Sequence, residues 1–160
     1  MIVRPATLDD ANAICDVHVR SIRALCANDY TQQQIESWTR FKAADNYRRG
    51  MTERGEVIFV AEIGGKIVGF SSLEKDEITS VYVVPEGVGR GAGRALVEAA
   101  ESHARDQGIA KIRLRSTLTS IGFYLHTGYT RDDDTVFKLR DGIELQCVWM
   151  HKQLPRGTGF

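Results

Sequence analysis

Four glycines lie between a strong strand pattern and a strong helix pattern, and this segment constrains the chain more than any other. The strand pattern covers residues 77–84 and stops at Pro85, and the helix pattern covers residues 91–107. Alternating glycines let successive backbone amides turn toward one point, because no Cβ blocks the approach. The helix start behind them adds about half a positive charge and free N–H groups. The segment therefore predicts a diphosphate site built on Gly87, Gly89, Gly91 and Gly93.

Three phosphate-binding designs use glycines at such a turn. A P-loop requires G-x-x-x-x-G-K-[ST], and this turn has no lysine followed by serine or threonine, which excludes it. A dinucleotide-binding fold requires G-x-G-x-x-[GA], which Gly87, Gly89 and Ala92 satisfy. That fold also requires an acidic residue at the end of the next strand, which here reads Arg-Leu-Arg-Ser over residues 113–116. A nucleotide-binding oxidoreductase fragment therefore stays open as an alternative, and it predicts binding of NAD(P).

The remaining pattern predicts one domain that mixes helices and strands. Thr7 and Thr31 are N-cap residues before two helical patterns, and a third helical pattern covers residues 43–51. Two runs of strand-forming residues flank Gly64-Gly65, which is a hairpin turn signal. Further strands are expected over 2–6, 109–115, 137–139 and 143–150, and a short helix over 120–126. No linker interrupts these patterns, so we expect a single domain over residues 1–152 and a mobile tail over 153–160.

Composition excludes several classes of function. Lysine plus arginine equals aspartate plus glutamate, at 21 each, so the chain has no general attraction for nucleic acid or an anionic membrane. No long apolar stretch follows Met1, which argues against a signal peptide or a membrane span and makes the cytoplasm the expected location.

Cysteine and histidine give no sign of a metal centre. Cys15, Cys26 and Cys147 are odd in number and form no C-x-x-C pair, which argues against a disulfide framework or a zinc site. The four histidines have no metal-ligand spacing, so we interpret them as structural or surface residues: His18, His103, His126 and His151.

The glycine segment resembles the acyl-CoA signature of the GNAT superfamily of N-acyltransferases, which reads [QR]-x-x-G-x-[GA] at a helix start. Gly91 and Gly93 stand at the two glycine positions, and Val88 replaces the Gln or Arg. That replacement removes a side-chain contact but leaves the backbone amides in place. Residues 120–129 resemble a later segment of the family, A-x-x-F-Y-x-x-x-G-[FY], and residues 5–11 resemble its opening. The resemblance covers residues 2–150 in one consistent order.

This resemblance implies a fold and an activity. The implied fold is of the α/β (α+β) type, with a central mixed, mostly antiparallel sheet of about seven strands and about four flanking helices. The sheet is splayed in the middle, where the pantetheine arm of the cofactor inserts. The implied enzyme is an N-acetyltransferase that moves the acetyl group of acetyl-CoA to a primary amine of a small molecule or peptide. Transfer occurs by direct attack in a ternary complex, without a metal. A homodimer through the last strands is typical of the family.

The resemblance also implies which residues contact acetyl-CoA. Val81 and Val83 offer backbone contacts along the pantetheine arm, and Arg90 and Arg94 are either phosphate ligands at the rim or solvated side chains. The full implied set is Val81, Tyr82, Val83, Val88, Gly89, Arg90, Gly91, Ala92, Gly93, Arg94 and Thr117. Since Val88 departs from the signature, a non-catalytic acyl-CoA-binding regulatory module stays open as an alternative function.

Two residues are candidates for the chemistry. Tyr124 lies where many relatives place the tyrosine that protonates the coenzyme A sulfur; the alternative is a core aromatic residue. Glu77 lies in the register where the histone-acetylating branch places its general base, and an apolar cleft would raise the pKa of such a carboxyl. The alternatives are a solvated turn residue and an ordered water as base. An acidic run over residues 132–134 would favour a cationic amine if it lies beside the cleft.

Overall fold

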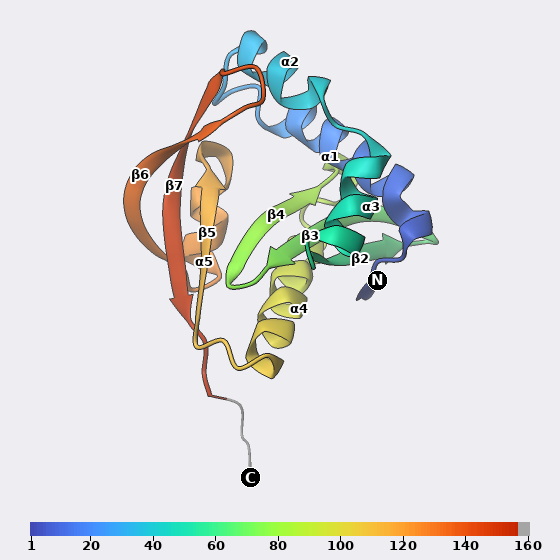
Figure 1. Ribbon diagram of the computed structural model, residues 1–160, viewed down its shortest axis with the longest axis vertical. Coiled ribbons are helices and arrows are strands. Elements are labelled where there is room, and N and C mark those ends of the chain that lie inside the picture. The colour runs from blue at the N-terminus through green and yellow to red at the C-terminus, as the bar shows by residue number, and fades with distance from the viewer. Residues whose placement is uncertain (157–160) are drawn as a thin grey trace.

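The computed structural model describes residues 1–156 and contains, within them, a seven-stranded sheet in the order β1-β2-β3-β4-β5-β7-β6 (Figure 1). Only β4 and β5 run parallel to each other, and every other neighbouring pair is antiparallel. The strands are β1 (Ile2–Pro5), β2 (Val57–Ile63), β3 (Lys66–Glu74), β4 (Glu77–Val83), β5 (Lys111–Thr117), β6 (Thr130–Lys138) and β7 (Glu144–Gln153). The expected mixed, mostly antiparallel sheet is confirmed.

Five α-helices cover the described part of the sheet. The side chain of Thr31 caps the second helix by accepting a hydrogen bond from the amide of Gln34, as the sequence predicts. Gly91 caps the fourth helix in the left-handed conformation, with φ 82°. The helices are α1 (Ala11–Leu25), α2 (Gln32–Arg40), α3 (Ala44–Glu53), α4 (Ala92–Asp106) and α5 (Ile121–His126).

The helices lie on opposite faces of the first four strands. Helix α4 packs against β2, β3 and β4 (Figure 1). Helix α1 packs against β3 and β4 from the other side, and α3 packs against α1. Leu96 of α4 and Ile14 of α1 are fully buried, because apolar residues recur at helical spacing along both helices. Phe70 of β3 lies in the same core. The first half of the molecule is therefore a sheet with both faces covered.

The parallel contact between β4 and β5 is short, and a bulge in β4 ends it. The two strands pair only at Glu77↔Arg113 and Ile78↔Leu114. Against β3, residue Thr79 is an extra residue, since Ser72 pairs with Ser80 and Leu73 pairs with Ile78. A bulge bends its strand and increases the local twist, so β4 turns away from β5 at this point. The sheet is therefore splayed in the middle, as expected.

Polar side chains hold the bulge in place. The hydroxyl of Thr79 lies 2.9 Å from the hydroxyl of Ser72 and 3.2 Å from a carboxylate oxygen of Glu56. Ser72 also donates a hydrogen bond to Glu56. These three side chains come from β4, β3 and the residue before β2, so they fix the position of the bulge against the neighbouring strands.

The far end of the opening is bridged by the chain around α2. The hydroxyl of Tyr30 donates to the carbonyl of Gln146 on β7 at 2.6 Å, and the side chain of Gln34 donates to the carbonyl of Glu144 at 2.9 Å. Trp38 belongs to the same apolar cluster as Leu145 of β7. The two halves of the sheet thus meet at β4–β5 and again at α2, with an opening between them.

The C-terminal strands differ from the sequence prediction. Strand β6 starts at Thr130 rather than at Phe137, because its first residues are exposed and polar and give no alternating pattern. Gln153 belongs to β7, and Leu154 is buried with its amide bonded to the carbonyl of Ala110 at 2.8 Å. The start of the expected mobile tail is therefore wrong by at least two residues. Residues 157–160 lie outside the described part of the chain.

A buried carboxylate links α4 to the second half of the sheet. Glu101 of α4 is only 4% exposed. It accepts a hydrogen bond from the hydroxyl of Tyr129 at 2.9 Å and pairs with the ammonium of Lys152 on β7 at 3.0 Å. Removing one partner of a buried pair leaves the other charge without compensation, which costs more than the pair contributes. The link therefore stabilises the relative position of the two halves.

We expect Glu101→Ala to lower the free energy of unfolding by about 2–4 kcal/mol, because it leaves the buried polar groups of Lys152 and Tyr129 without their partner. In a chain of this size the melting temperature should fall by about 5–12 °C, measurable by calorimetry. The matched control is Glu98→Ala on the same helix, whose carboxylate is exposed and pairs with Arg94 at 3.5 Å; it should change stability by less than about 0.5 kcal/mol. Equal losses of unfolding free energy in both variants would show that the buried pair contributes no more to stability than an exposed one.

Candidate active site

The splayed strands expose two unpaired backbone edges that face each other. Beyond Ile78 and Leu114, β4 and β5 form no pairs, although β4 continues to Val83 and β5 to Thr117. The free N–H and C=O groups along these edges can bind an extended chain that carries amide groups. A narrow cavity of about 20 Å³ lies at this place, and its lining includes Ser80, Val81, Tyr82, Thr117 and Tyr124.

The glycine-rich turn presents a run of free backbone amides. Gly89 and Gly91 have φ values of 79° and 82°, the left-handed region that a glycine adopts without strain. The turn and cap hydrogen bonds of this segment use the amides of Gly87, Val88 and Ala95. Between Gly89 and Arg94, no backbone amide donates to another group within residues 1–156. Such a run at a helix start suits an anion, so the residues present fit a diphosphate.

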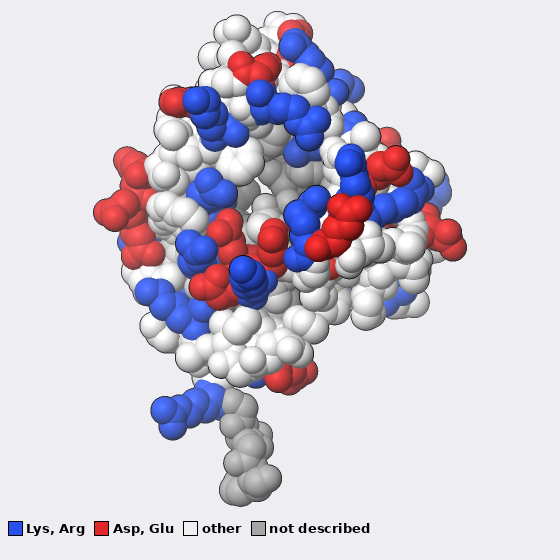
Figure 2. Space-filling model, viewed as in Figure 1, with Lys and Arg blue, Asp and Glu red and all other residues white. Residues whose placement is uncertain are grey.

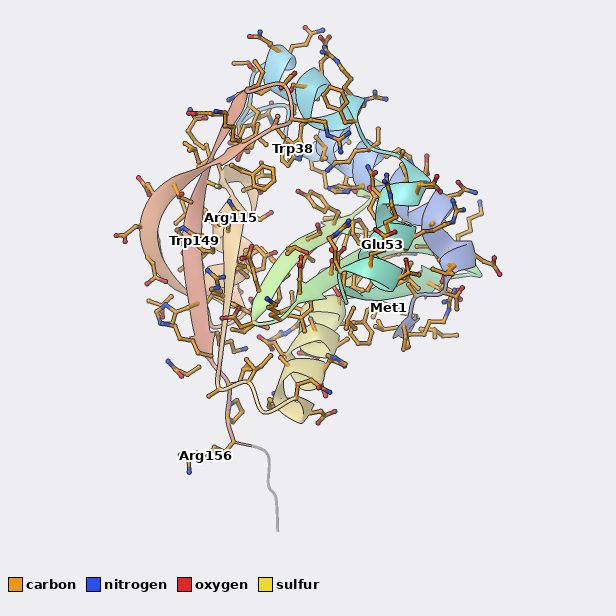
Figure 3. All side chains as sticks on the ribbon, in the orientation of Figure 1. Met1, Trp38, Glu53, Arg115, Trp149 and Arg156 are labelled. Atoms are coloured by element: carbon orange, nitrogen blue, oxygen red, sulfur yellow. The ribbon has the colours of Figure 1, made fainter. Side chains whose placement is uncertain are left out.

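A second, wider cavity of about 600 Å³ lies on the α1–α3 side of the opening. Trp38 of α2 and Arg115 of β5 point into the space between the two halves of the molecule (Figure 3). The wide and narrow cavities share one stretch of wall, which includes Ser80, Tyr82 and Thr117. A ligand in the wide cavity and a ligand between the strands can therefore touch the same segment of β4.

The wide cavity combines an aromatic part with a charged part. Tyr30 and Trp38 are 5.3 Å apart between ring centroids, and Tyr82 lies 6.4 Å from Trp38. Near the β3–β4 turn, the lining contains both cations and carboxylates: Arg54, Glu56, Glu74, Lys75, Asp76, Glu77, Arg113 and Arg115. Figure 2 shows lysine, arginine and acidic side chains gathered around a hollow on this face. The arrangement suits a polar ligand that also carries an apolar group.

A family model described as an acetyltransferase (GNAT) domain matches residues 26–153. This chain belongs to the GNAT family of acetyltransferases. The sequence predictions of the family, of the fold and of an acetyl-CoA-dependent N-acetyltransferase are thereby confirmed. The structure describes residues 1–156, and none of their helices is long and apolar enough to cross a membrane.

Similar proteins support the assignment along most of the chain. A GCN5-related N-acetyltransferase from Rhodopseudomonas palustris is 28% identical, with a TM-score of 0.89 over 96% of this chain and 95% of its own. A spermidine N(1)-acetyltransferase from Thermoplasma acidophilum is 24% identical over 82% of this chain and 89% of its own length. An N-acetyltransferase solved from the same organism in complex with coenzyme A is 23% identical, with a TM-score of 0.73 over 95% of this chain and 98% of its own.

In this GNAT chain, Tyr124 lies at the narrow cavity between the strands. Its ring packs against Phe123 at 5.1 Å and Tyr129 at 5.5 Å between centroids, and only 5% of the residue is exposed. Burial raises the pKa of its phenol above the ordinary value, so the hydroxyl stays protonated throughout the neutral range. No hydrogen bond engages that hydroxyl among the described residues. Both the packing role and the acid role fit this position.

Glu77 has different surroundings from those that the sequence suggested. Its carboxylate lies 3.5 Å from the guanidinium of Arg113 and 3.7 Å from that of Arg115. The expectation of an apolar cleft is therefore wrong, because alternate residues of β5 place both arginines on the face toward Glu77. Glu77 does line the wide cavity, so its role as a base stays a prediction.

Some of the other predicted residues line the narrow cavity, and others lie outside it. Val81, Tyr82 and Thr117 line the narrow cavity, and Val83 packs in the core beneath the turn. Val88 is 55% exposed, while the side chain of Arg94 is exposed and lies 3.5 Å from Glu98. The acidic run over 132–134 lies on the exposed strand β6 and does not line either cavity. It therefore gives no support for a cationic acceptor.

His18 is a cavity residue that the sequence interpretation left among the structural or surface histidines. It is buried on α1, its Nδ1 lies 2.8 Å from the hydroxyl of Tyr47, and its ring lies 4.3 Å from that of Tyr82. Burial and the nearby charge of Lys42 lower the pKa of the imidazole well below its ordinary value, so the ring is neutral at pH 7. The helical spacing from Ile14 to His18 to Ile22 is the signal that places it on the inner face of α1.

The free amides at the start of α4 predict how coenzyme A binding responds to mutation. Gly91→Val should abolish binding in calorimetry, because a branched side chain at φ 82° disturbs the turn and covers the amides. Gly93→Val should also abolish it, since a Cβ there already meets the ring of Phe123 at 3.3 Å. Arg90→Ala should weaken binding only modestly, because the residue is exposed.

The matched control for backbone strain is Gly108→Val at the other end of α4, where φ is 80° and a Cβ likewise meets no atom within 4 Å. It should cost similar stability and leave coenzyme A binding unchanged. Wild-type affinity in a folded Gly91→Val variant would contradict the assignment of the amides.

Proposed function

We propose that this acetyltransferase transfers the acetyl group of acetyl-CoA to a primary amine of a small molecule or peptide that enters through the wide cavity. The observation that carries the proposal is the wall shared by the two cavities at Ser80, Tyr82 and Thr117. The amine reaches this wall from the α1–α3 side, and the thioester reaches it from between β4 and β5. Both reactants then meet at one segment, which supports direct attack in a ternary complex.

The residues of the chain supply binding and proton transfer. The amides between Gly89 and Arg94 hold the diphosphate, and the free edges of β4 and β5 hold the peptide-like arm. A backbone amide of β4 near Val81 polarises the acetyl carbonyl as negative charge develops on its oxygen. The hydroxyl of Tyr124 gives its proton to the departing thiolate. Glu77, directly or through water, is the candidate that takes the proton from the amine.

The prediction for Tyr124→Phe is a fall in kcat and kcat/KM together, with little change in the KM for acetyl-CoA. The variant removes only a hydroxyl, and general acid catalysis contributes about a hundredfold to ten-thousandfold. Steady-state kinetics with an amine that wild-type enzyme acetylates provides the measurement. Because the raised pKa keeps the phenol protonated, Tyr124 should cause no loss of wild-type activity at moderately alkaline pH.

The leaving group provides the control for Tyr124. The defect should shrink with an acyl donor whose thiol is more acidic, because that thiolate departs without protonation. Full activity of Tyr124→Phe with acetyl-CoA, when chemistry limits turnover, would show that Tyr124 is only a packing residue.

For Glu77, we expect the Gln variant to keep its affinity for acetyl-CoA and to lose rate mainly near neutral pH, where free amines are largely protonated. A pH profile of kcat/KM measures this. Asp76→Asn is the matched control, since Asp76 also pairs with Arg113, at 3.4 Å, but lies in the β3–β4 turn before β4 begins. Equal profiles for both variants would indicate that loss of an arginine partner, rather than loss of a base, explains the defect.

An assay of thiol release from acetyl-CoA distinguishes an enzyme from a non-catalytic binding module. Release of thiol from acetyl-CoA in the presence of a mixed pool of amines supports the transferase. Tight binding of acetyl-CoA without transfer to any amine would instead support a regulatory module. The cytoplasmic location and the homodimer stay predictions.

A further inference from the structure

Most of the positive charge inside the wide cavity is already neutralised by the chain. Arg113 lies 3.4 Å from Asp76 and 3.5 Å from Glu77, and Arg115 lies 3.7 Å from Glu77. Arg54 lies 3.5 Å from Glu56. These arginines and carboxylates therefore compensate one another, which reduces the attraction of Glu56, Asp76 and Glu77 for a cationic ligand. Glu74 also lines the cavity and has no ion pair within residues 1–156, and its sequence neighbour Lys75 is a cation.

Lys42 also lines the wide cavity, but no carboxylate within residues 1–156 pairs with it. It lies in the turn between α2 and α3, half-buried, and within residues 1–156 its ammonium makes no ion pair and no hydrogen bond. Within residues 1–156, no fully buried side-chain nitrogen or oxygen lacks a hydrogen-bond partner, so the ammonium of Lys42 keeps some access to solvent, and Lys42 lines the cavity. Lys75 also lacks an ion pair, but it is exposed in the β3–β4 turn, where water solvates it.

The surroundings of Lys42 make a ligand anion favourable there. Burial lowers the pKa of the ammonium, and the charge of Arg140 lowers it further, while Cys15 and Glu56 act in the opposite direction. His18 faces the same part of the cavity as a neutral ring. A partly desolvated ammonium without a charged partner gains stability when an anion enters the cavity and pairs with it.

Another part of the cavity lining is aromatic. Tyr30, Trp38 and Tyr82 form an aromatic wall, with edge-to-face contacts between Tyr30 and Trp38 and between Trp38 and Tyr82. Such a wall gains from burying a hydrocarbon or aromatic group. It offers no charge that would hold a second ammonium of a polyamine, and Lys42 repels one.

We propose, on the basis of the proposed function, that the acceptor is an amine that also carries a carboxylate, and that Lys42 binds this carboxylate. A single ammonium matches a single negative charge, which favours a carboxylate over a phosphate dianion. The aromatic wall favours acceptors with an apolar side group. Lys42 is thus a specificity-determining residue for the acceptor, in the same cavity as the segment of β4 where transfer takes place.

The test uses matched acceptors with the full-length protein. Acetylation rates are compared for aminocarboxylates and for the amines that lack only the carboxylate, such as phenylalanine and phenethylamine, with spermidine and a phosphate-bearing amine alongside. Aminocarboxylates of increasing chain length scan the distance between the two groups. We expect kcat/KM to favour the best aminocarboxylate over its matched amine by about tenfold to a hundredfold, as for one charged hydrogen bond.

Variants of Lys42 then locate the preference. Lys42→Met should remove the preference by raising the KM of the aminocarboxylate while leaving the matched amine and acetyl-CoA affinity unchanged; Lys42→Arg, which keeps the charge, should retain most of it. Lys111→Met on the exposed start of β5 is the control and should change nothing. A preference for spermidine, for the phosphate-bearing amine or for the matched amine would overturn the inference, as would an equal loss of kcat on all amines in both Lys42 variants. Transfer to no amine at all would instead contradict the proposed function.

Discussion

The pairing of β4 with β5 at only two residue pairs determines the geometry of the site. A bulge at Thr79 bends β4 just after the last pair, and the hydroxyl of Thr79 bonds to Ser72 and Glu56 around it. Had the ladder continued, each strand would have satisfied the backbone groups of the other, and no edge would be free for a ligand. Because it stops, two edges remain open inside the molecule rather than at its surface.

The rest of the site depends on that opening. The free amides of the glycine-rich turn follow directly on β4, so an anion held there lies at one end of the opening. Tyr124 reaches the same gap from α5 on the other half of the sheet. The segment around α2 joins the halves again through the hydrogen bonds of Tyr30 and Gln34 to β7, and Tyr30 also lines the wide cavity. The ion pair between Glu101 of α4 and Lys152 of β7 also links the two halves.

The sequence predicts the parts of this site that depend on local pattern. Glycines with positive φ at a helix start, and an aromatic pair on a short helix, are local signals; Gly89 and Gly91 do have positive φ, and Tyr124 lines the narrow cavity. The bulge at Thr79 depends on register with β3, which no local pattern encodes. The arginine partners of Glu77 depend on the register between β4 and β5, and for that reason the expected apolar surroundings were wrong. No pattern in the sequence indicates that Lys42 lines a cavity, because its position there follows from how α2 and α3 pack.

A crystal structure with bound coenzyme A tests the central claim most directly, since that claim concerns where the cofactor lies. We expect the diphosphate on the amides between Gly89 and Arg94, and the pantetheine arm between the free edges of β4 and β5. We also expect the sulfur within hydrogen-bonding distance of the Tyr124 hydroxyl. A cofactor seated in the wide cavity, with the edges beyond Ile78 and Leu114 still unpaired, would contradict that claim.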